Sequence, residues 1–224
     1  LPADNLGSDI DQHLRGAAGV VEKDWKQFLF MTAGYMHYMD DKTINVFMPY
    51  CAKLSKFSEW ICQLWGESLG KQKASGEHFG TTPVRAYGAI DQHSQLQLYL
   101  DGPKDKFITF FGVNTHEHEA PLPGGVSPDY EYFSGKRLGE LLNTELKATE
   151  AALLLKERPS MRLDIASLSE AALGELFMLF EHVVAIIGLA NGIDPFDPPA
   201  VEDGKPFLYG LTGPEGYSDK KENF

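Results

Sequence analysis

Three short apolar segments, set between longer helical patterns, constrain the fold of this chain more than any other feature. Residues 43–48, 106–113 and 161–165 are apolar and contain β-branched or aromatic side chains, as expected of buried strands. Between the first two, Leu54, Phe57, Trp60, Ile61, Leu64 and Trp65 recur at three- and four-residue spacing, which is typical of a helix. Strands that alternate with helices favour βαβ units. The sequence therefore predicts an α/β fold, a three-layer sandwich with a mainly parallel sheet.

Helical patterns cover most of the remaining chain. Helices are expected over residues 9–21, 25–39 and 135–156, in a segment from Cys51 to Glu67 with the apolar positions 54–65, and in a short segment after Gln92. The run Ser167–Glu170 has the spacing of a capping box at the start of the most apolar helix, and a short helical piece is expected at 201–205. No internal repeat or interdomain linker is visible, so residues 1–224 are expected to form a single domain.

Charge and hydropathy narrow the classes of partner. A net charge of -12 argues against nucleic-acid binding, although a few local cations could still bind a sugar phosphate. The longest apolar stretch, residues 176–190, is interrupted by Glu181 and His182 and is expected to be a buried core helix. With no signal peptide visible, we expect a cytoplasmic protein without a membrane partner.

The two cysteines, Cys51 and Cys62, fall in one expected helix. At a helical rise of about 1.5 Å per residue they would lie roughly 16 Å apart, too far for a disulfide. Two free thiols, both structural, are therefore expected.

Three polar segments contain side chains suited to acid–base chemistry. Glu67 lies in Gly66-Glu67-Ser68-Leu69-Gly70-Lys71, and His93 lies in the segment Asp91–Leu98, after the Gly-, Thr- and Pro-rich run 80–84. Lys205 ends Val201-Glu202-Asp203-Gly204-Lys205. Taken singly, each has an ordinary interpretation: a solvated glutamate, a core or capping histidine, and a surface lysine.

Together these segments resemble the motifs of the glucose-6-phosphate isomerases, and the match is to the C-terminal half of that family. The resemblance implies a sugar-isomerase (SIS) type domain that interconverts glucose 6-phosphate and fructose 6-phosphate. It assigns Glu67 as the base that moves the C2 proton and His93 as the group that opens the sugar ring. Lys205 supplies positive charge near the developing oxyanion. Gln92 and Ser94, beside the histidine, are expected to bind substrate.

The resemblance also implies what this chain lacks. Family members have an additional N-terminal domain with a Ser/Thr loop that holds the substrate phosphate, and residues 1–224 contain no counterpart of it. Their active sites form across a homodimer interface, with the histidine contributed by the neighbouring subunit. No cofactor is implied. We therefore expect a C-terminal domain that is inactive alone and that works in a homodimer of the full-length protein.

Two departures keep alternatives open. Pro198 stands where the family usually has glutamine, and Ala200 stands where it usually has glycine. The alternatives are an isomerase for another phospho-sugar and a non-catalytic module that binds sugar phosphates. The run His116–Glu119 could hold a metal, but it lacks a third spaced ligand, so a solvated loop and no metal site are expected.

Overall fold

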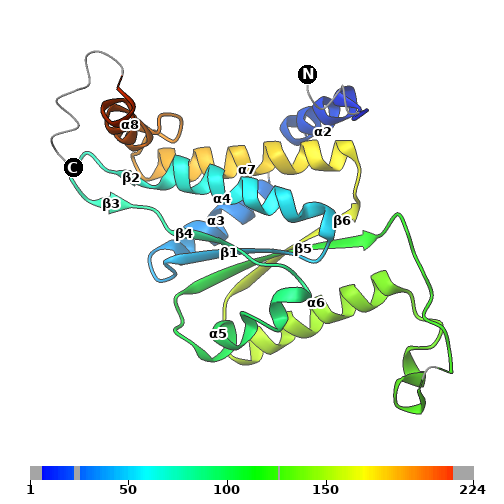
Figure 1. Ribbon diagram of the computed structural model, residues 1–224. Coiled ribbons are helices and arrows are strands. Elements are labelled where there is room, and N and C mark those ends of the chain that lie inside the picture. Colours follow the sequence, from blue (N-terminus) through cyan, green and yellow to red (C-terminus); the bar gives the residue numbers. More distant parts are fainter. Residues whose placement is uncertain (1–6, 23–25, 126, 214–224) are drawn as a thin grey trace.

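The computed structural model describes residues 7–22, 26–125 and 127–213. A four-stranded sheet forms the middle of three layers (Figure 1). Every neighbouring pair in this sheet is parallel. In spatial order its strands are β4 (Thr82–Arg85), β1 (Ile44–Pro49), β5 (Lys106–Thr115) and β6 (Ser160–Ser167). The predicted three-layer α/β fold with a mainly parallel sheet is confirmed.

Helices cover both faces of the sheet (Figure 1). One face carries α3 (Lys26–Met39), α4 (Ser55–Leu69) and α7 (Glu170–Ala190), with α2 (Ile10–Glu22) packed on α7. The other face carries α5 (Leu96–Asp101) and α6 (Leu138–Leu155). Shorter elements are η1 (Ala52–Leu54), the β2–β3 hairpin (Lys71–Gln72 and His78–Phe79), η2 (Ile90–Gln92), η3 (Pro128–Phe133), η4 (Pro199–Asp203) and α8 (Gly204–Thr212).

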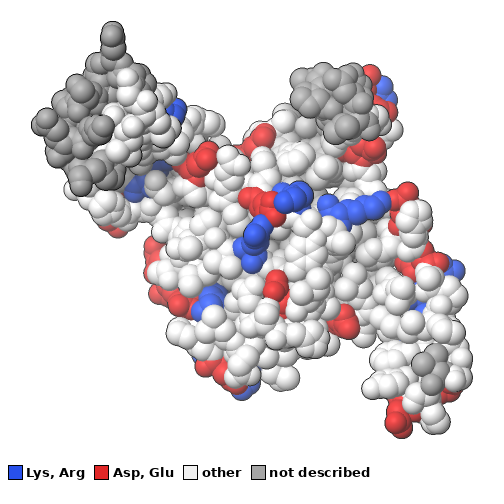
Figure 2. Space-filling view, in the orientation of Figure 1, with Lys and Arg blue, Asp and Glu red and all other residues white. Residues whose placement is uncertain are grey.

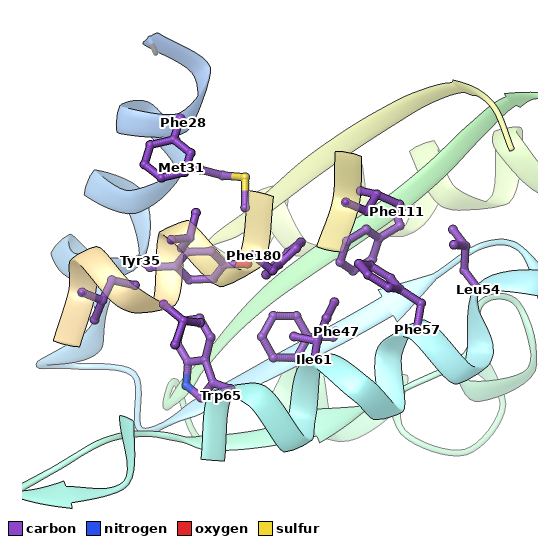
Figure 3. Packing of buried hydrophobic residues seen from close by; sticks show 14 of the residues in the cluster. Phe28, Met31, Tyr35, Phe47, Leu54, Phe57, Ile61, Trp65, Phe111 and Phe180 are labelled. Atoms are coloured by element: carbon purple, nitrogen blue, oxygen red, sulfur yellow. The ribbon is translucent and has the colours of Figure 1, made fainter. Parts of the chain in front are cut away.

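The alternation of side chains along the strands divides the core into two clusters. In β1, Phe47 faces α3, α4 and α7, whereas Val46 and Met48 face α5 and α6. All three side chains are fully buried. Figure 3 shows the first cluster, in which aromatic rings from the helices close over the sheet. Burial of each such side chain stabilises the fold by about 1.5–3 kcal/mol. The strands are continuous apolar runs because helices cover both faces of the sheet.

Helix α7 crosses the first cluster. It is long and apolar enough to span a membrane by length and composition. Its residues Phe180, Val183 and Ile187 are fully buried against neighbouring helices and the sheet. The high hydropathy of α7 is therefore explained by its packing in the core, as predicted.

The start of α7 differs from the prediction. The N-cap is Ser169, whose side chain accepts a hydrogen bond from the backbone N–H of Ala172 at 3.2 Å. Ser167, the predicted cap, is the last residue of β6 and lies opposite Thr115 in the sheet. The predicted Ser167–Glu170 capping box is wrong because the strand continues through the residue that would have begun it.

Strand β4 and the β2–β3 hairpin were absent from the expected elements. Strand β4 is only four residues long and contains Pro83. It is an edge strand, where a missing backbone N–H is tolerated. It begins inside the run 80–84, which the sequence alone suggested to be a loop. The polar C-terminal segment from Gly213, which is expected from its composition to be a loose tail, lies outside the described residues after its first residue.

Both cysteines are free thiols, as expected. Cys62 lies on α4, but Cys51 is an extended residue that precedes η1, with φ −156° and ψ 123°. The expectation that both belong to one helix is therefore wrong, although the expected absence of a bond between them holds.

Candidate active site

Glu67 lies in the last turn of α4 with its side chain exposed. The helix is fixed by its buried face, which includes Trp65. The Trp65 indole N–H also donates to Thr81 Oγ1 at 2.9 Å, which ties the end of α4 to the start of β4. The Glu67 carboxylate accepts a hydrogen bond from Gln63 Nε2 at 3.2 Å. Glu67 is thus an accessible carboxylate on a rigid support.

The chain turns sharply after Glu67, which explains two glycines of this region. Gly80 has φ +123°, a conformation that side chains rarely adopt. A Cβ at Gly80 would lie 2.8 Å from the carbonyl oxygen of Leu69, and one at Gly70 would lie 2.7 Å from that of Gly66. Close backbone packing therefore requires glycine at both positions.

Lys205 is the second residue of α8, and its side chain is exposed. Its ammonium donates to Glu202 Oε1 at 2.6 Å, and this hydrogen bond raises the pKa of Lys205 above its usual value. The preceding segment is tied to the end of α4, because the Lys71 ammonium donates to the backbone carbonyl of Asp197. Helix α8 accordingly lies at the same end of the molecule as β2 (Figure 1).

His93 is the C-terminal cap of η2, with an exposed side chain. Asp91 organises the loop before it by accepting hydrogen bonds from the Tyr87 backbone N–H at 2.6 Å and from Ser94 Oγ at 2.5 Å. Among the described residues, none forms a hydrogen bond with the His93 ring. The imidazole is therefore available to a ligand.

The side-chain amide of Gln92 is bonded to buried groups at the end of β1 and in α6. This amide donates to Tyr50 Oη at 2.7 Å and to Thr149 Oγ1 at 2.8 Å. Tyr50 and Thr149 are not among the residues predicted from the sequence. One signal was available for Tyr50, which lies two residues after the predicted strand 43–48, because ligand sites of parallel sheets gather at the carboxyl ends of strands. Nothing local in the sequence marks Thr149.

Glu67 and His93 lie at opposite ends of the sheet. Helix α4 starts near the carboxyl end of β1 and runs back, so Glu67 lies roughly 18 Å along the helix axis from Ser55. His93 instead follows η2, which is bound to Tyr50 at the carboxyl end of β1. Across the described residues, no hydrogen bond or ion pair joins any two of Glu67, His93 and Lys205. The fold thus places the Glu67 and Lys205 segments together and His93 apart from both.

Two hollows in the surface of the described residues do not contain these side chains. A groove of about 850 Å³ lies between α3, α7 and β6, and its lining includes Phe30, Met161 and Leu176. A smaller hollow of about 490 Å³ lies beside the loop after β5. Glu67, His93 and Lys205 are absent from both linings.

The loop after β5 includes the run His116–Glu119. Glu117 pairs with the Lys53 ammonium, and His116 and Glu119 pack beside Gly139 of α6. Within residues 7–22, 26–125 and 127–213, no three or more His, Cys, Asp or Glu side chains are grouped so that they could hold a metal ion. Whether the loop binds metal therefore rests on the sequence prediction, which favours a solvated loop.

Charges are mixed on the surface. Figure 2 shows acidic side chains interspersed with basic ones over the described residues of the visible face, without a continuous basic patch. This distribution agrees with the net charge of -12 and provides no footprint for a polyanion such as nucleic acid on that face.

Relatives of this chain carry a consistent name. A protein of Rubrobacter xylanophilus named glucose-6-phosphate isomerase is 40% identical over 97% of this chain and 51% of its own length. A probable glucose-6-phosphate isomerase of Methanococcus maripaludis is 38% identical over 95% of this chain and 49% of its own length. The chain thus spans about half the length of the curated relatives that it matches.

Solved structures share the fold. A hypothetical protein from Thermus thermophilus superposes with a TM-score of 0.88 at 30% identity, covering 93% of this chain and 51% of that one. A glucose-6-phosphate isomerase from Chlamydia trachomatis superposes with a TM-score of 0.76 at 23% identity, covering 90% of this chain and 42% of that one. A family model described as phosphoglucose isomerase matches residues 5–212. With that match extending over nearly its whole length, the chain belongs to the phosphoglucose isomerase family.

Proposed function

We propose that this chain supplies the acid–base groups of a glucose-6-phosphate isomerase. The proposal rests on the family of the chain together with the exposure of the three candidate residues. The relatives at 36–40% identity are named glucose-6-phosphate isomerase, and Glu67, His93 and Lys205 all present exposed side chains from ordered elements. A module that only bound sugar phosphate would have no need of a base.

The proposed reaction uses one group for each chemical task. His93 opens the sugar ring by giving a proton to the ring oxygen as the bond from C1 to that oxygen breaks, while the C1 hydroxyl loses its proton to water and becomes the aldehyde. Glu67 then takes the C2 proton of the open aldose and returns it to C1 through an enediol. The Lys205 ammonium stabilises the negative charge that develops on the substrate oxygen. Gln92, through its Oε1, and Ser94 bind sugar hydroxyls beside the histidine.

Residues 1–224 act, in this proposal, as one C-terminal sugar-isomerase domain of a longer polypeptide. A second domain supplies the phosphate-binding loop, and a neighbouring subunit of a homodimer supplies the histidine of each site. Two observations support this arrangement: Glu67 and His93 lie at opposite ends of the sheet, and the chain spans about half the length of its relatives. The domain alone would be inactive, because positioning of the substrate supplies a large part of the rate.

Glucose 6-phosphate and fructose 6-phosphate are the proposed substrates, and no cofactor takes part. The proposed location is the cytoplasm, where these sugar phosphates are metabolised. Neither a nucleic acid nor a membrane is proposed as a partner.

Substitution of Glu67 by glutamine in the full-length enzyme tests the proposal. Glu67→Gln preserves size and hydrogen bonding but removes the base, so kcat should fall by a factor on the order of 10³ with little change in KM. Steady-state assays in both directions measure the change.

A control tests whether any nearby carboxylate would behave in the same way. Glu77 lies in the hairpin that follows α4 and pairs with Lys73 at 3.1 Å on the surface. Glu77→Gln should leave kcat within twofold of wild type. Activity of Glu67→Gln within a few-fold of wild type would refute the assignment of the base.

A further inference from the structure

A network of buried and part-buried hydrogen bonds anchors the segment that carries His93. Gln92 Nε2 donates to Tyr50 Oη at 2.7 Å and to Thr149 Oγ1 at 2.8 Å. The Tyr50 hydroxyl donates to Thr149 Oγ1 at 2.9 Å, and the Thr149 hydroxyl donates to the backbone carbonyl of Glu145 at 2.9 Å. These hydrogen bonds therefore connect η2, past the end of β1, to the backbone of α6.

The tyrosine ring also supports the loop by packing. Tyr50 is fully buried, and Thr149 is 4% exposed. Gly88 lies against the Tyr50 ring so closely that a Cβ would come within 2.3 Å of it, and its backbone N–H donates to the Pro49 carbonyl at 3.1 Å. The segment from Gly88 to Gln92 is thus held by Tyr50 at two points, the ring and the hydroxyl.

A second buried pair provides a comparison within the same sheet. On the opposite face, Tyr35 Oη and Thr109 Oγ1 are 2.7 Å apart, and both side chains are fully buried. The two hydroxyls of that pair bond to each other, and neither forms a hydrogen bond with a proposed site residue. The Tyr50–Thr149 pair differs by its third partner, the residue directly before His93.

We propose that Tyr50 and Thr149 are positioning residues that hold the His93 imidazole at the angle required for ring opening. The inference rests on the proposed function, because it assigns a purpose to His93. The Tyr50 and Thr149 hydroxyls, which lie on buried residues, accept the hydrogen bonds of Gln92 where little water competes for them. Small displacements of an acid–base group lower its rate sharply, whereas the Glu67 step, at the other end of the sheet, should be indifferent to this anchor.

The test separates ring opening from proton transfer in the full-length enzyme. Tyr50→Phe and Thr149→Val each remove a hydroxyl from the hydrogen-bond network and keep the shape of the side chain. Both should slow the anomerisation of glucose 6-phosphate, followed by NMR exchange, about five- to tenfold. Isomerisation of a substrate that is already open-chain should stay within twofold. Thr149→Ser, which retains the hydroxyl, should restore anomerisation.

Controls make the outcome decisive. Tyr35→Phe removes a matched buried hydroxyl from the other face and should leave both rates unchanged. Equal loss of both rates in Tyr50→Phe and Thr149→Val, or no loss in either, would overturn the inference. Where Tyr50→Phe does not fold, Thr149→Val and Thr149→Ser decide the question.

His93→Gln distinguishes failure of this inference from failure of the proposed function. If His93→Gln loses anomerisation and the anchor variants do not, only the anchor is wrong. If His93→Gln anomerises glucose 6-phosphate normally, the proposed role of the histidine fails first, and the role of the anchor fails with it.

Discussion

At the scale of single residues, accessibility separates the proposed catalytic groups from the groups that support them. Glu67, His93 and Lys205 are exposed, whereas Trp65, Tyr50 and Thr149 are buried and bonded. Motif patterns identify the first set because acid–base chemistry restricts which residue types can serve. The second set becomes visible only when distant segments are brought together, as Tyr50 and Thr149 are 99 residues apart in sequence.

The two thiols provide a prediction at the same scale. Burial raises the pKa of the Cys62 thiol to about 11. At pH 8 only about one Cys62 in a thousand is then a thiolate, and its alkylation should be far slower than that of an exposed thiol. The rate should rise about tenfold per pH unit up to that pKa, because the thiolate is the reactive form.

Mass spectrometry of the alkylated protein measures these rates. The unlabelled protein, measured without reductant, should have the mass of two free thiols. A mass lower by two protons, assigned to a Cys51–Cys62 bond, would contradict the structure.

At the scale of elements, the sequence predicts the central strands and the main helices but misses the edge strand β4 and the residue that caps α7. The segments 43–48, 106–113 and 161–165 are recognisable because both faces of a central sheet are apolar. Strand β4 is short, contains Pro83 and lies at the edge, so its place depends on pairing with β1 rather than on its own composition. Two serines near the start of α7 both fit a cap, and the register of β6 with β5 decides between them.

This choice of cap can be measured directly. Ser169→Ala should remove the hydrogen bond to the Ala172 N–H and destabilise the first turn of α7 by about 1 kcal/mol. Amide hydrogen exchange in that turn should become about fivefold faster. Ser167→Ala is the matched control and should leave exchange in the turn unchanged. Faster exchange in Ser167→Ala and unchanged exchange in Ser169→Ala would show instead that Ser167 caps the helix.

At the scale of the whole molecule, this chain presents the proposed catalytic groups without enclosing them. The Glu67 and Lys205 segments lie at one end of the sheet and His93 at the other, and neither hollow described above is lined by these residues. The candidate residues come from a resemblance of sequence motifs to those of a family. The sequence cannot predict their separation, which follows from α4 running back along the sheet while β4 leads to η2 at the carboxyl ends.

We propose that Glu67 and His93 of one chain serve different active sites of a homodimer. Glu67→Gln and His93→Gln each place a defect in both sites of a mutant homodimer. A mixed dimer, however, combines both defects in one site and leaves the other site intact. Random pairing makes about half of the dimers mixed, and one of the two sites in each is complete.

Co-expression of the two full-length variants, followed by assay of glucose 6-phosphate isomerisation, tests this claim most directly. The account predicts that the purified mixture recovers about a quarter of wild-type activity, although each variant alone is nearly inactive. Each variant expressed separately gives the background. Activity of the mixture no higher than that background would show that Glu67 and His93 act within one subunit, and the account would be wrong.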